Sequence, residues 1–365
     1  MSDISGGAPS KLQSADLSLT TALIVEDQPQ ILKLFSDCLK MLRVGHVLPV
    51  SSAALARQTV EGIINNPSSA GISHIDFALV DWNLIGNPFA TSKDSEDQQG
   101  PDLCRWLRQQ EFGRFMPILG LSAYSNKGII SEMIDSGVNS YLSKPFAVHD
   151  LSRQIQRIVS DIKPYIVTPS GYFGPDRRRV TTEVNLERRR SQNGVRAFKP
   201  PRALRQKTSA TVDIAETDVT RIMQQMREIA PPDYHTVVEL HLEQITKLLD
   251  TTPIDADDAA SKDIVRQNCD DINFLCNDIL GNPGGFTYQM IAETMASMSR
   301  FVSDDYFVYS KQADSMLRQQ IATVEFVLKR DMKGPARGEM RKLFSESFAV
   351  IEKVLRQNRK KSRDS

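Results

Sequence analysis

A short apolar run that ends on one carboxylate constrains the fold of this chain more than any other feature. The run is Ile75-Asp-Phe-Ala-Leu-Val-Asp81. Three further apolar segments also end on polar side chains: one runs into Glu26 and Asp27, one into Ser122, and one leads to Lys144. Buried parallel strands deliver side chains to the carboxyl edge of a sheet, where open α/β sheets keep their sites. We therefore expect these groups to line one pocket.

Apolar strand-like segments alternate with amphipathic helix-like segments between residues 21 and 163. This alternation, at this spacing, predicts a five-stranded, doubly wound parallel sheet with helices on both faces. The expected strands are 22–26, 46–50, 75–80, 117–121 and 140–142. The expected helices are 29–42, 53–64, 102–111, 128–135 and 148–162.

The composition describes a soluble globular protein without a dominant charge. Lysines plus arginines equal the acids, 45 against 45 in 365 residues, so net charge indicates no partner. The four cysteines form no C-x-x-C pair, which argues against structural zinc and a disulfide framework. The start has no apolar signal region, and no run approaches the ~18 apolar residues of a membrane span. We expect a cytoplasmic protein with buried thiols.

The sequence divides into four parts. Residues 1–20 are polar and predict a flexible N-terminus, and residues 21–163 form the α/β domain. Residues 164–213 lose apolar periodicity and carry two Arg triplets, which predicts a basic, disordered linker. Residues 214–360 read as helix with short connections, which predicts an all-α bundle. Asp255 and Ser303 are the expected N-caps of its third and fifth helices.

The order of motifs in the α/β domain resembles that of the receiver domain of bacterial two-component response regulators. The motifs are Val25-Glu26-Asp27, Asp81-Trp-Asn83, Leu121-Ser122-Ala123 and Tyr141-Leu-Ser-Lys144-Pro145-Phe146. The Asp-Trp-Asn triplet is similar to single-domain chemotaxis regulators. The resemblance covers residues 21–163 and implies a flavodoxin-like fold.

The resemblance implies specific roles for the residues at the strand ends. Asp81 would be the nucleophile that accepts a phosphoryl group, a reaction that depends mainly on positioning and charge neutralisation. Lys144 would pair with the phosphoryl oxygens, and Ser122 would donate a hydrogen bond to one of them. Tyr141 would be an aromatic switch that turns inward as Ser122 moves, although a packing role for this ring stays open.

A magnesium site is expected beside the nucleophile. Glu26, Asp27 and Asp81 would crowd three negative charges, which requires a hard divalent cation. Mg²⁺ prefers a few carboxylates, a backbone carbonyl and waters, and the carbonyl here would be that of Asn83.

The loop 84–100 is the main departure from the receiver pattern, because it is about ten residues longer than the family's short loop, an insertion that chain-closure entropy tolerates. A surface insertion without a role is one interpretation. The other is a lid that modulates phosphodonor access or the lifetime of the phosphoryl group.

The helical half resembles the histidine-phosphotransfer (HPt) domain, but only weakly. The stretch that carries the resemblance runs from Cys276 to Tyr288, and Asn277 stands where the phospho-accepting His belongs. Leu280 replaces the following Lys, and Gly281, Gly284 and Gly285 occupy the small positions that let a partner approach. An unrelated four-helix bundle is the alternative. Since Asn has no nucleophilic ring nitrogen, this pseudo-phosphotransfer position would make the bundle a docking or dimerising module.

These patterns predict a phosphorelay response regulator that is not otherwise an enzyme. A partner histidine kinase or phosphotransfer protein would phosphorylate Asp81, and the helical bundle would contact a downstream protein, a receiver domain or a second copy. One alternative is a transcriptional regulator that binds nucleic acid through the basic linker, although a solvated tether is the favoured interpretation of that segment. The other is a relay that passes phosphate to His241.

Overall fold

The structure is a computed structural model, and it describes residues 13–65, 72, 74–84, 100–123, 127–160, 163–168, 171–176, 195–201 and 203–364. The chain divides into two compact units, with the main break between Gln225 and Met226. No helix in these described ranges is both long and apolar enough to cross a membrane.

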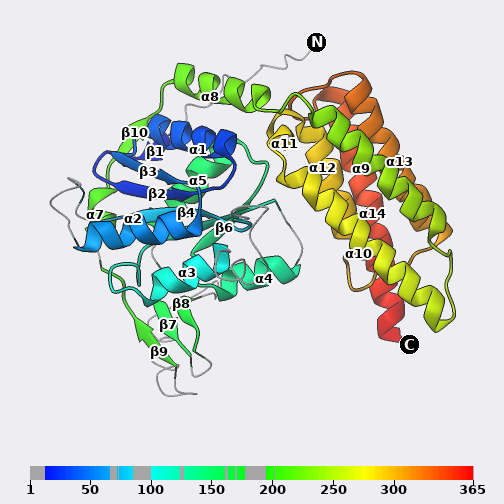
Figure 1. The fold of residues 1–365 in the computed structure, drawn as a ribbon, viewed down its shortest axis with the longest axis horizontal. Coiled ribbons are helices and arrows are strands. Elements are labelled where there is room, and N and C mark those ends of the chain that lie inside the picture. Colours follow the sequence, from blue (N-terminus) through cyan, green and yellow to red (C-terminus); the bar gives the residue numbers. More distant parts are fainter. Residues whose placement is uncertain are drawn as a thin grey trace, which may run out of the picture. The chain divides into compact units, whose positions relative to one another are not determined.

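The first unit contains a five-stranded sheet in the order β3-β2-β4-β5-β6 (Figure 1). Its strands are β2 (Thr21–Val25), β3 (His46–Val50), β4 (Phe77–Asp81), β5 (Ile118–Ser122) and β6 (Ser140–Ser143). β2 pairs in parallel with β3 and β4, and β4 with β5. The predicted fold class is confirmed, and each strand boundary lies within two residues of the prediction.

Helices connect these strands and cover both faces of the sheet. They are α1 (Pro29–Met41), α2 (Ala53–Asn65), α3 (Gly100–Gln109), α4 (Lys127–Asp135) and α5 (Val148–Ser160). Apolar side chains of α2, α3 and Met133 of α4 form one cluster with the sheet. β2, β4 and β5 are buried along their whole length, as expected for strands covered on both faces.

Short strands occur where the sequence predicted a structureless linker. β7 (Tyr165–Val167) pairs antiparallel with β8 (Phe173–Pro175) and β9 (Arg196–Phe198). The described parts of 164–213 are therefore not disordered, and the prediction was wrong for them. The Arg triplets at 177–179 and 188–190 lie outside the described residues.

The buried guanidinium of Arg108 lies beside this small sheet. It donates to the carbonyls of Gly137 (2.9 Å), Gly113 (2.8 Å) and Met116 (2.6 Å) and to Oδ1 of Asn139 (2.9 Å). It also lies 5.3 Å from the ring centre of Tyr165, which is fully buried in β7. The small sheet thus contacts the end of α3 through the ring of Tyr165, whose hydroxyl also donates to the carbonyl of Phe115 at 3.3 Å.

The N-terminal segment is also more ordered than predicted. β1 (Gln13–Ala15) pairs antiparallel with β10 (Thr211–Asp213), and Leu17 is fully buried. Of the predicted flexible segment 1–20, residues 1–12 lie outside the described ranges. For residues 13–20 the prediction was wrong, because three-residue strands carry too little periodicity to be recognised.

A buried acid fixes the segment before β10. Lys207, in α7 (Ala203–Lys207), donates to Asp76 Oδ1 at 2.9 Å, and Asp76 Oδ2 accepts the backbone N–H of Thr21 at 2.9 Å. Asp76 is 7% exposed, so its charge is compensated by direct partners rather than by water. This pair ties the end of the presumed linker to the first strand of the sheet.

The first unit extends further along the chain than predicted. α8 (Glu216–Glu228) was expected in the helical bundle, but residues up to Gln225 group with the sheet. Nε2 of Gln225 donates to Asp37 in α1 at 3.3 Å, and Ile222 is fully buried. The predicted boundary at 213/214 therefore lies about a dozen residues too early.

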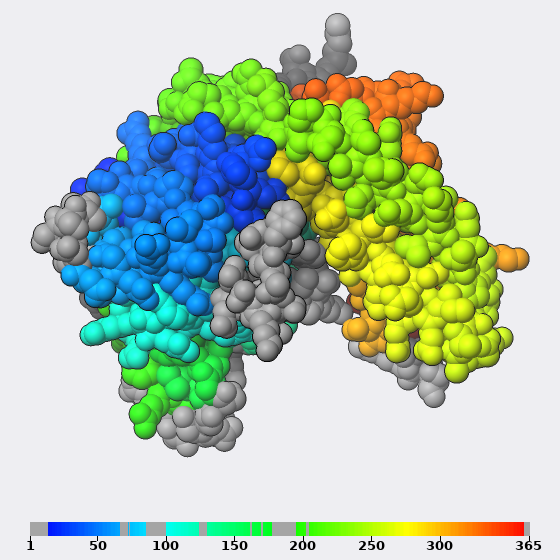
Figure 2. Space-filling model, viewed as in Figure 1, coloured from blue at the N-terminus to red at the C-terminus, as the bar shows by residue number. Residues whose placement is uncertain are grey.

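The second unit is helical, and α9 and α10 lie side by side on its visible face (Figure 2). Its helices are α9 (Tyr234–Thr251), α10 (Ala259–Gly281), α11 (Gly284–Thr287), α12 (Gln289–Val302), α13 (Lys311–Lys329) and α14 (Gly338–Asp364). Buried apolar side chains from the long helices form one core. The predicted bundle is confirmed as a helix-rich unit.

Both predicted N-caps of this unit were wrong. α10 is capped by Asp258, which accepts the N–H of Ser261 at 2.9 Å, whereas Asp255 precedes the helix with a φ of +54°. α13 is capped by Ser310 rather than Ser303. Suitable residues stand at several positions before each helix, and the sequence alone does not say which one adopts the extended cap conformation.

Candidate phosphoryl-acceptor site

Three carboxylates converge at the carboxyl ends of β2 and β4. One oxygen from each of Glu26, Asp27 and Asp81 lies within 4.8 Å of the other two. The register that pairs Val25 with Val80 places the residues after β2 directly beside the end of β4. Neighbouring parallel strands therefore bring together acids that are about 55 residues apart in sequence.

This acidic site is largely shielded from water. Glu26 is fully buried, Asp81 is 5% exposed and Asp27 is half-buried. Three charges this close repel one another, and burial strengthens the repulsion. An all-oxygen donor set of this kind fits a hard divalent cation such as Mg²⁺. The described residues therefore could hold the predicted metal.

The predicted hydroxyl and cation stand at the same edge of the sheet. Ser122 ends β5, the neighbour of β4, and is 1% exposed. Lys144 follows β6, the next strand, and is 5% exposed. The Lys144–Pro145 peptide bond is cis. A buried ammonium and a buried hydroxyl at the edge of the sheet that carries the acidic cluster are the groups that a dianionic ligand would require.

The helix after the acceptor strand starts in direct contact with the backbone of the site. A Cβ atom on Gly100 would lie 2.0 Å from the carbonyl oxygen of Asp81. The N–H of Gly100 donates to the carbonyl of Trp82 at 3.1 Å. Only glycine allows this approach, so α3 begins in contact with the end of the strand that carries the acceptor.

The remaining predicted residues of this site are less constrained. The side chain of Tyr141 is 36% exposed, so in this structure its ring lies at the surface of β6. Asn83 is half-buried and lies two residues after the end of β4, and its role as a carbonyl ligand stays a prediction. The hypothesis of a lid concerns residues 85–99, which lie outside the described residues. Both the aromatic switch and the lid stay predictions.

Asn277, the proposed counterpart of a phospho-accepting His, faces the inside of the helical unit. It is 3% exposed, and its Nδ2 donates to Asn273 Oδ1 at 3.1 Å. Ser299 of α12 donates to Oδ1 of Asn277 at 3.3 Å and to Oδ1 of Asn273 at 2.7 Å. A side chain held between α10 and α12 is not presented to a partner, so the HPt interpretation of this position is not supported.

One glycine of the HPt-like stretch, Gly284, also has an internal role. A Cβ on Gly284 would lie 2.1 Å from the ring of Tyr234, which stacks on Tyr288 with centroids 5.3 Å apart. Gly284 is therefore needed for aromatic packing inside the unit. The sequence had suggested that Gly284 lets a partner approach, and the structure instead gives it this internal contact.

The histidine of the relay alternative is engaged at both ring nitrogens. His241 Nδ1 lies 2.7 Å from the carbonyl of Val237, and Nε2 lies 2.8 Å from Asp278 Oδ2. Neither nitrogen is presented as a nucleophile in this arrangement. Sequence reasoning also missed the buried charges Arg108 and Asp76, because a charged residue in sequence reads as a surface residue.

The geometry defines a class: a doubly wound α/β domain with an acid cluster, a hydroxyl and a lysine at its carboxyl edge. Residues 22–156 match the family model described as the response regulator receiver domain. The N-terminal part of the chain is therefore a receiver domain of a two-component system. The match leaves the helical unit without a family assignment.

Curated relatives share the same region. The chain is 32% identical over 85 residues to the chemotaxis protein CheY of Pseudomonas aeruginosa, which is 23% of this chain and 60% of that protein. It is 32% identical over 130 residues to the response regulator RppA of Synechocystis sp., 33% of this chain and 50% of that protein. The chain thus spans only about half the length of the relatives it matches.

Solved structures give matches of the same extent. One is the receiver domain of the sensor histidine kinase PA1611 from Pseudomonas aeruginosa, with a magnesium ion coordinated in its active-site cleft. It is 28% identical, covers 38% of this chain and 96% of its own chain, and has a TM-score of 0.30.

Proposed function

We propose that this protein is a response regulator that accepts a phosphoryl group on Asp81 from a partner histidine kinase or phosphotransfer protein. The observation that carries the proposal is the buried cluster of Glu26, Asp27 and Asp81, whose oxygens lie within 4.8 Å of one another. A carboxylate kept at such an electrostatic cost is typical of a functional group rather than of packing.

The chemistry assigned to these residues is a phosphoryl transfer. An oxygen of Asp81 attacks phosphorus, the bond from phosphorus to the donor breaks, and the donor leaves with the bonding electron pair. The Lys144 ammonium balances charge on the equatorial oxygens, and the Ser122 hydroxyl donates a hydrogen bond to one of them.

The site also has to hold a cation. Glu26, Asp27, Asp81 and the carbonyl of Asn83 are the residues that would bind Mg²⁺, which when bound would neutralise charge on the incoming phosphoryl group. Without such a cation, the two neighbouring carboxylates would oppose the approach of an anionic donor. Chelation is therefore expected to abolish acceptance of the phosphoryl group.

The output is proposed to be protein–protein interaction through the helical unit, in the cytoplasm, rather than catalysis. The long helices with a shared core offer surfaces for a partner. The four cysteines are free and buried, which suits a reducing compartment. The nucleic-acid alternative rests on the Arg triplets outside the described residues and stays a prediction.

A phosphoryl-label experiment tests the proposal. Purified protein receives Mg²⁺ and labelled acetyl phosphate or phosphoramidate, beside Asp81→Asn and, as a matched control, Asp102→Asn. Asp102 is a partly exposed carboxylate on α3, paired with Arg105. The expected label is stable in acid, labile in base, lost in Asp81→Asn and kept in Asp102→Asn.

Two results would count against the proposal. Full labelling of Asp81→Asn would place the acceptor elsewhere. An acid-labile label in the wild-type protein would show that a histidine takes the phosphate and that the chain is a relay.

A further inference from the structure

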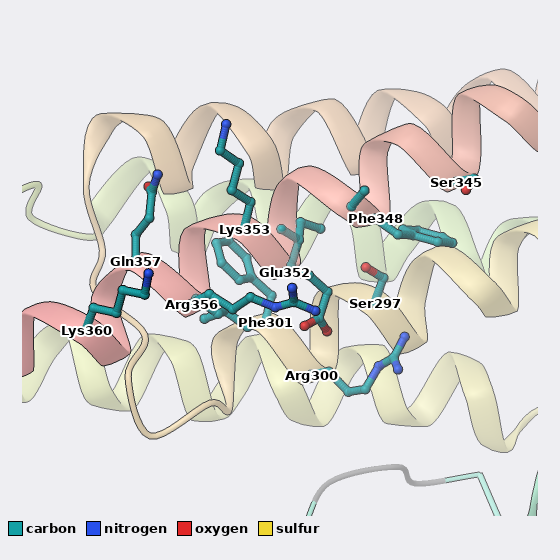
Figure 3. A pocket seen from close by; sticks show the side chains of 13 residues that line it. Ser297, Arg300, Phe301, Ser345, Phe348, Glu352, Lys353, Arg356, Gln357 and Lys360 are labelled. Carbon is teal, nitrogen blue, oxygen red and sulfur yellow. The ribbon is translucent and has the colours of Figure 1, made fainter. Parts of the chain in front are cut away.

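A groove runs between α12 and α14 in the helical unit (Figure 3). It encloses about 770 Å³, and we call it the α14 groove. Its apolar lining comes from Phe301 of α12 and from Phe348, Ile351 and Leu355 of α14. Phe301, Ile351 and Leu355 are at most 5% exposed, so the floor of the groove belongs to the core of the unit.

A second hollow of about 360 Å³ lies between α12, α13 and α14. Phe348 lines both hollows, and Phe326, Leu343 and Phe344 line the second one. Leu343 is 58% exposed and Phe326 is 41% exposed. The α14 groove follows α14 from Ser345 to Lys360, which is roughly 22 Å at the helical rise, whereas the second hollow opens on another side of α14. A groove of this length accommodates about 15 residues of a helix.

The rim of the α14 groove is basic. Arg300, Lys353, Arg356 and Lys360 stand around it, with Glu352 as the acid among its lining residues. Figure 3 shows Arg356 lying across the space between α14 and α12, with Arg300 on the opposite wall. Within the described part of the chain, none of these four cations forms an ion pair inside 4.0 Å. Three positive charges in excess remain available to a ligand.

We propose that the α14 groove binds an acidic amphipathic helix of a partner protein. The apolar floor would take residues of the ligand at i, i+3, i+4 and i+7, as in other helix-in-groove complexes. Acidic residues flanking that face would pair with Arg300, Lys353, Arg356 and Lys360. This inference deepens the proposed function, on which it rests, by naming the class of protein that the helical unit recognises.

Other occupants explain fewer of these observations. Duplex nucleic acid has regularly spaced phosphates but no apolar ridge to fill a floor of phenylalanine and leucine. A membrane would contact a convex surface, whereas this floor lies between two helices. A second copy would have to offer an acidic face, and α10 has one, with Asp270 and Asp271 beside Phe274, which is 65% exposed. Self-association measured by sedimentation tests that occupant.

The test uses the full chain and two fluorescein-labelled peptides of about 20 residues. One has Leu and Phe at helical spacing on one face and Glu on the other, and the second is a scrambled sequence of identical composition and charge. Binding is measured by fluorescence anisotropy without a phosphodonor, so the outcome does not depend on whether Asp81 is the acceptor. We expect the patterned peptide to bind and the scrambled one to bind at least roughly tenfold more weakly.

Two variants locate the site. Arg356→Glu/Lys360→Glu reverses two exposed rim charges and is expected to raise Kd roughly tenfold. Ala349→Asp places a charge on an exposed position of the α14 groove, leaves the core intact and is expected to raise Kd by a similar factor. The matched control is Lys262→Glu/Arg266→Glu, two exposed cations with the same spacing on α10, with an expected change of less than about twofold.

Three results would overturn the proposal. The first is equal binding of the scrambled peptide, or unchanged binding by both groove variants when circular dichroism shows them folded. The second is self-association in sedimentation that Arg356→Glu/Lys360→Glu abolishes, because the occupant is then a second copy. The third is tighter binding of duplex DNA or of phosphatidylglycerol vesicles than of the patterned peptide, lost in the same variant.

Discussion

Arg108 offers a sharp test of how the segments around the end of α3 are held together beside the small sheet β8-β7-β9. Its guanidinium is 4% exposed and donates to three backbone carbonyls and to Asn139. Arg108→Met keeps the apolar stem and removes every donor. Each buried acceptor that loses its partner costs about 1–3 kcal/mol, and water reaching some of them lowers the sum. We expect the free energy of unfolding to fall by about 3–5 kcal/mol.

The assay is urea unfolding followed by tryptophan fluorescence. The chain has two tryptophans, Trp82 and Trp106, and both belong to the first unit, so the signal reports on that unit alone. With a urea dependence of roughly 2 kcal/mol per molar, the midpoint of Arg108→Met should fall by about 2 M.

Arg105→Met is the matched control, one turn earlier on the same helix. Arg105 is 43% exposed and pairs with Asp102 and Glu132, so its loss should cost less than about 1 kcal/mol. If Arg108→Met unfolds within about 0.5 M of Arg105→Met, the buried cation does not hold these elements and the reasoning is refuted.

Three further predictions concern the helical unit and the thiols. Hydrogen bonds from Ser261 hold the pKa of Asp258 below its usual value, so the stability that this cap contributes is present above about pH 4 and is lost as the pH falls through the lower pKa of the folded state. Asp258→Ala should therefore lower the urea midpoint, followed by circular dichroism, at neutral pH. A difference in midpoint between wild type and variant that persists unchanged in acid contradicts this prediction. Burial raises the pKa of Cys104 and of Cys269 to about 12, so a thiol reagent near pH 8 should label the protein only after unfolding. Rapid labelling of the native chain would show that the thiols are accessible. Asn277→His should destabilise the helical unit by about 1–3 kcal/mol, because a larger ring must fit between α10 and α12. The variant should also gain no acid-labile phosphate. An acid-labile label would restore the HPt interpretation.

The receiver sheet and its site were predictable from sequence because each buried parallel strand is a continuous apolar run that ends on a polar group. Asp81 shows this directly, because the apolar run from Phe77 to Val80 can be buried on both sides only between two layers of helices. The neighbours of Asp81 then follow from strand order rather than from sequence distance. Only the strand order had to be assumed.

The features that were not predictable are of two kinds. β1, β7 and β10 have three residues each, too few for a period to emerge, so they were assigned to flexible segments. Asn277 was placed by its distance from a glycine-rich turn, and nothing in that spacing says which side of α10 packs on α12. Helix periodicity gives a face, but tertiary packing decides which partner that face receives.

The pairing of β1 with β10 has a consequence for the order in which the chain matures. Gln13 pairs with Asp213, so β1 obtains its partner strand only after about 200 further residues have been synthesised. At 5–20 residues per second this takes roughly 10–40 s. During that interval β1 has no partner strand, because it pairs only with β10 in a separate two-stranded sheet, and unpaired strands promote wrong pairing. A fragment that ends at residue 163, where the receiver pattern ends, would leave β1 without its partner permanently.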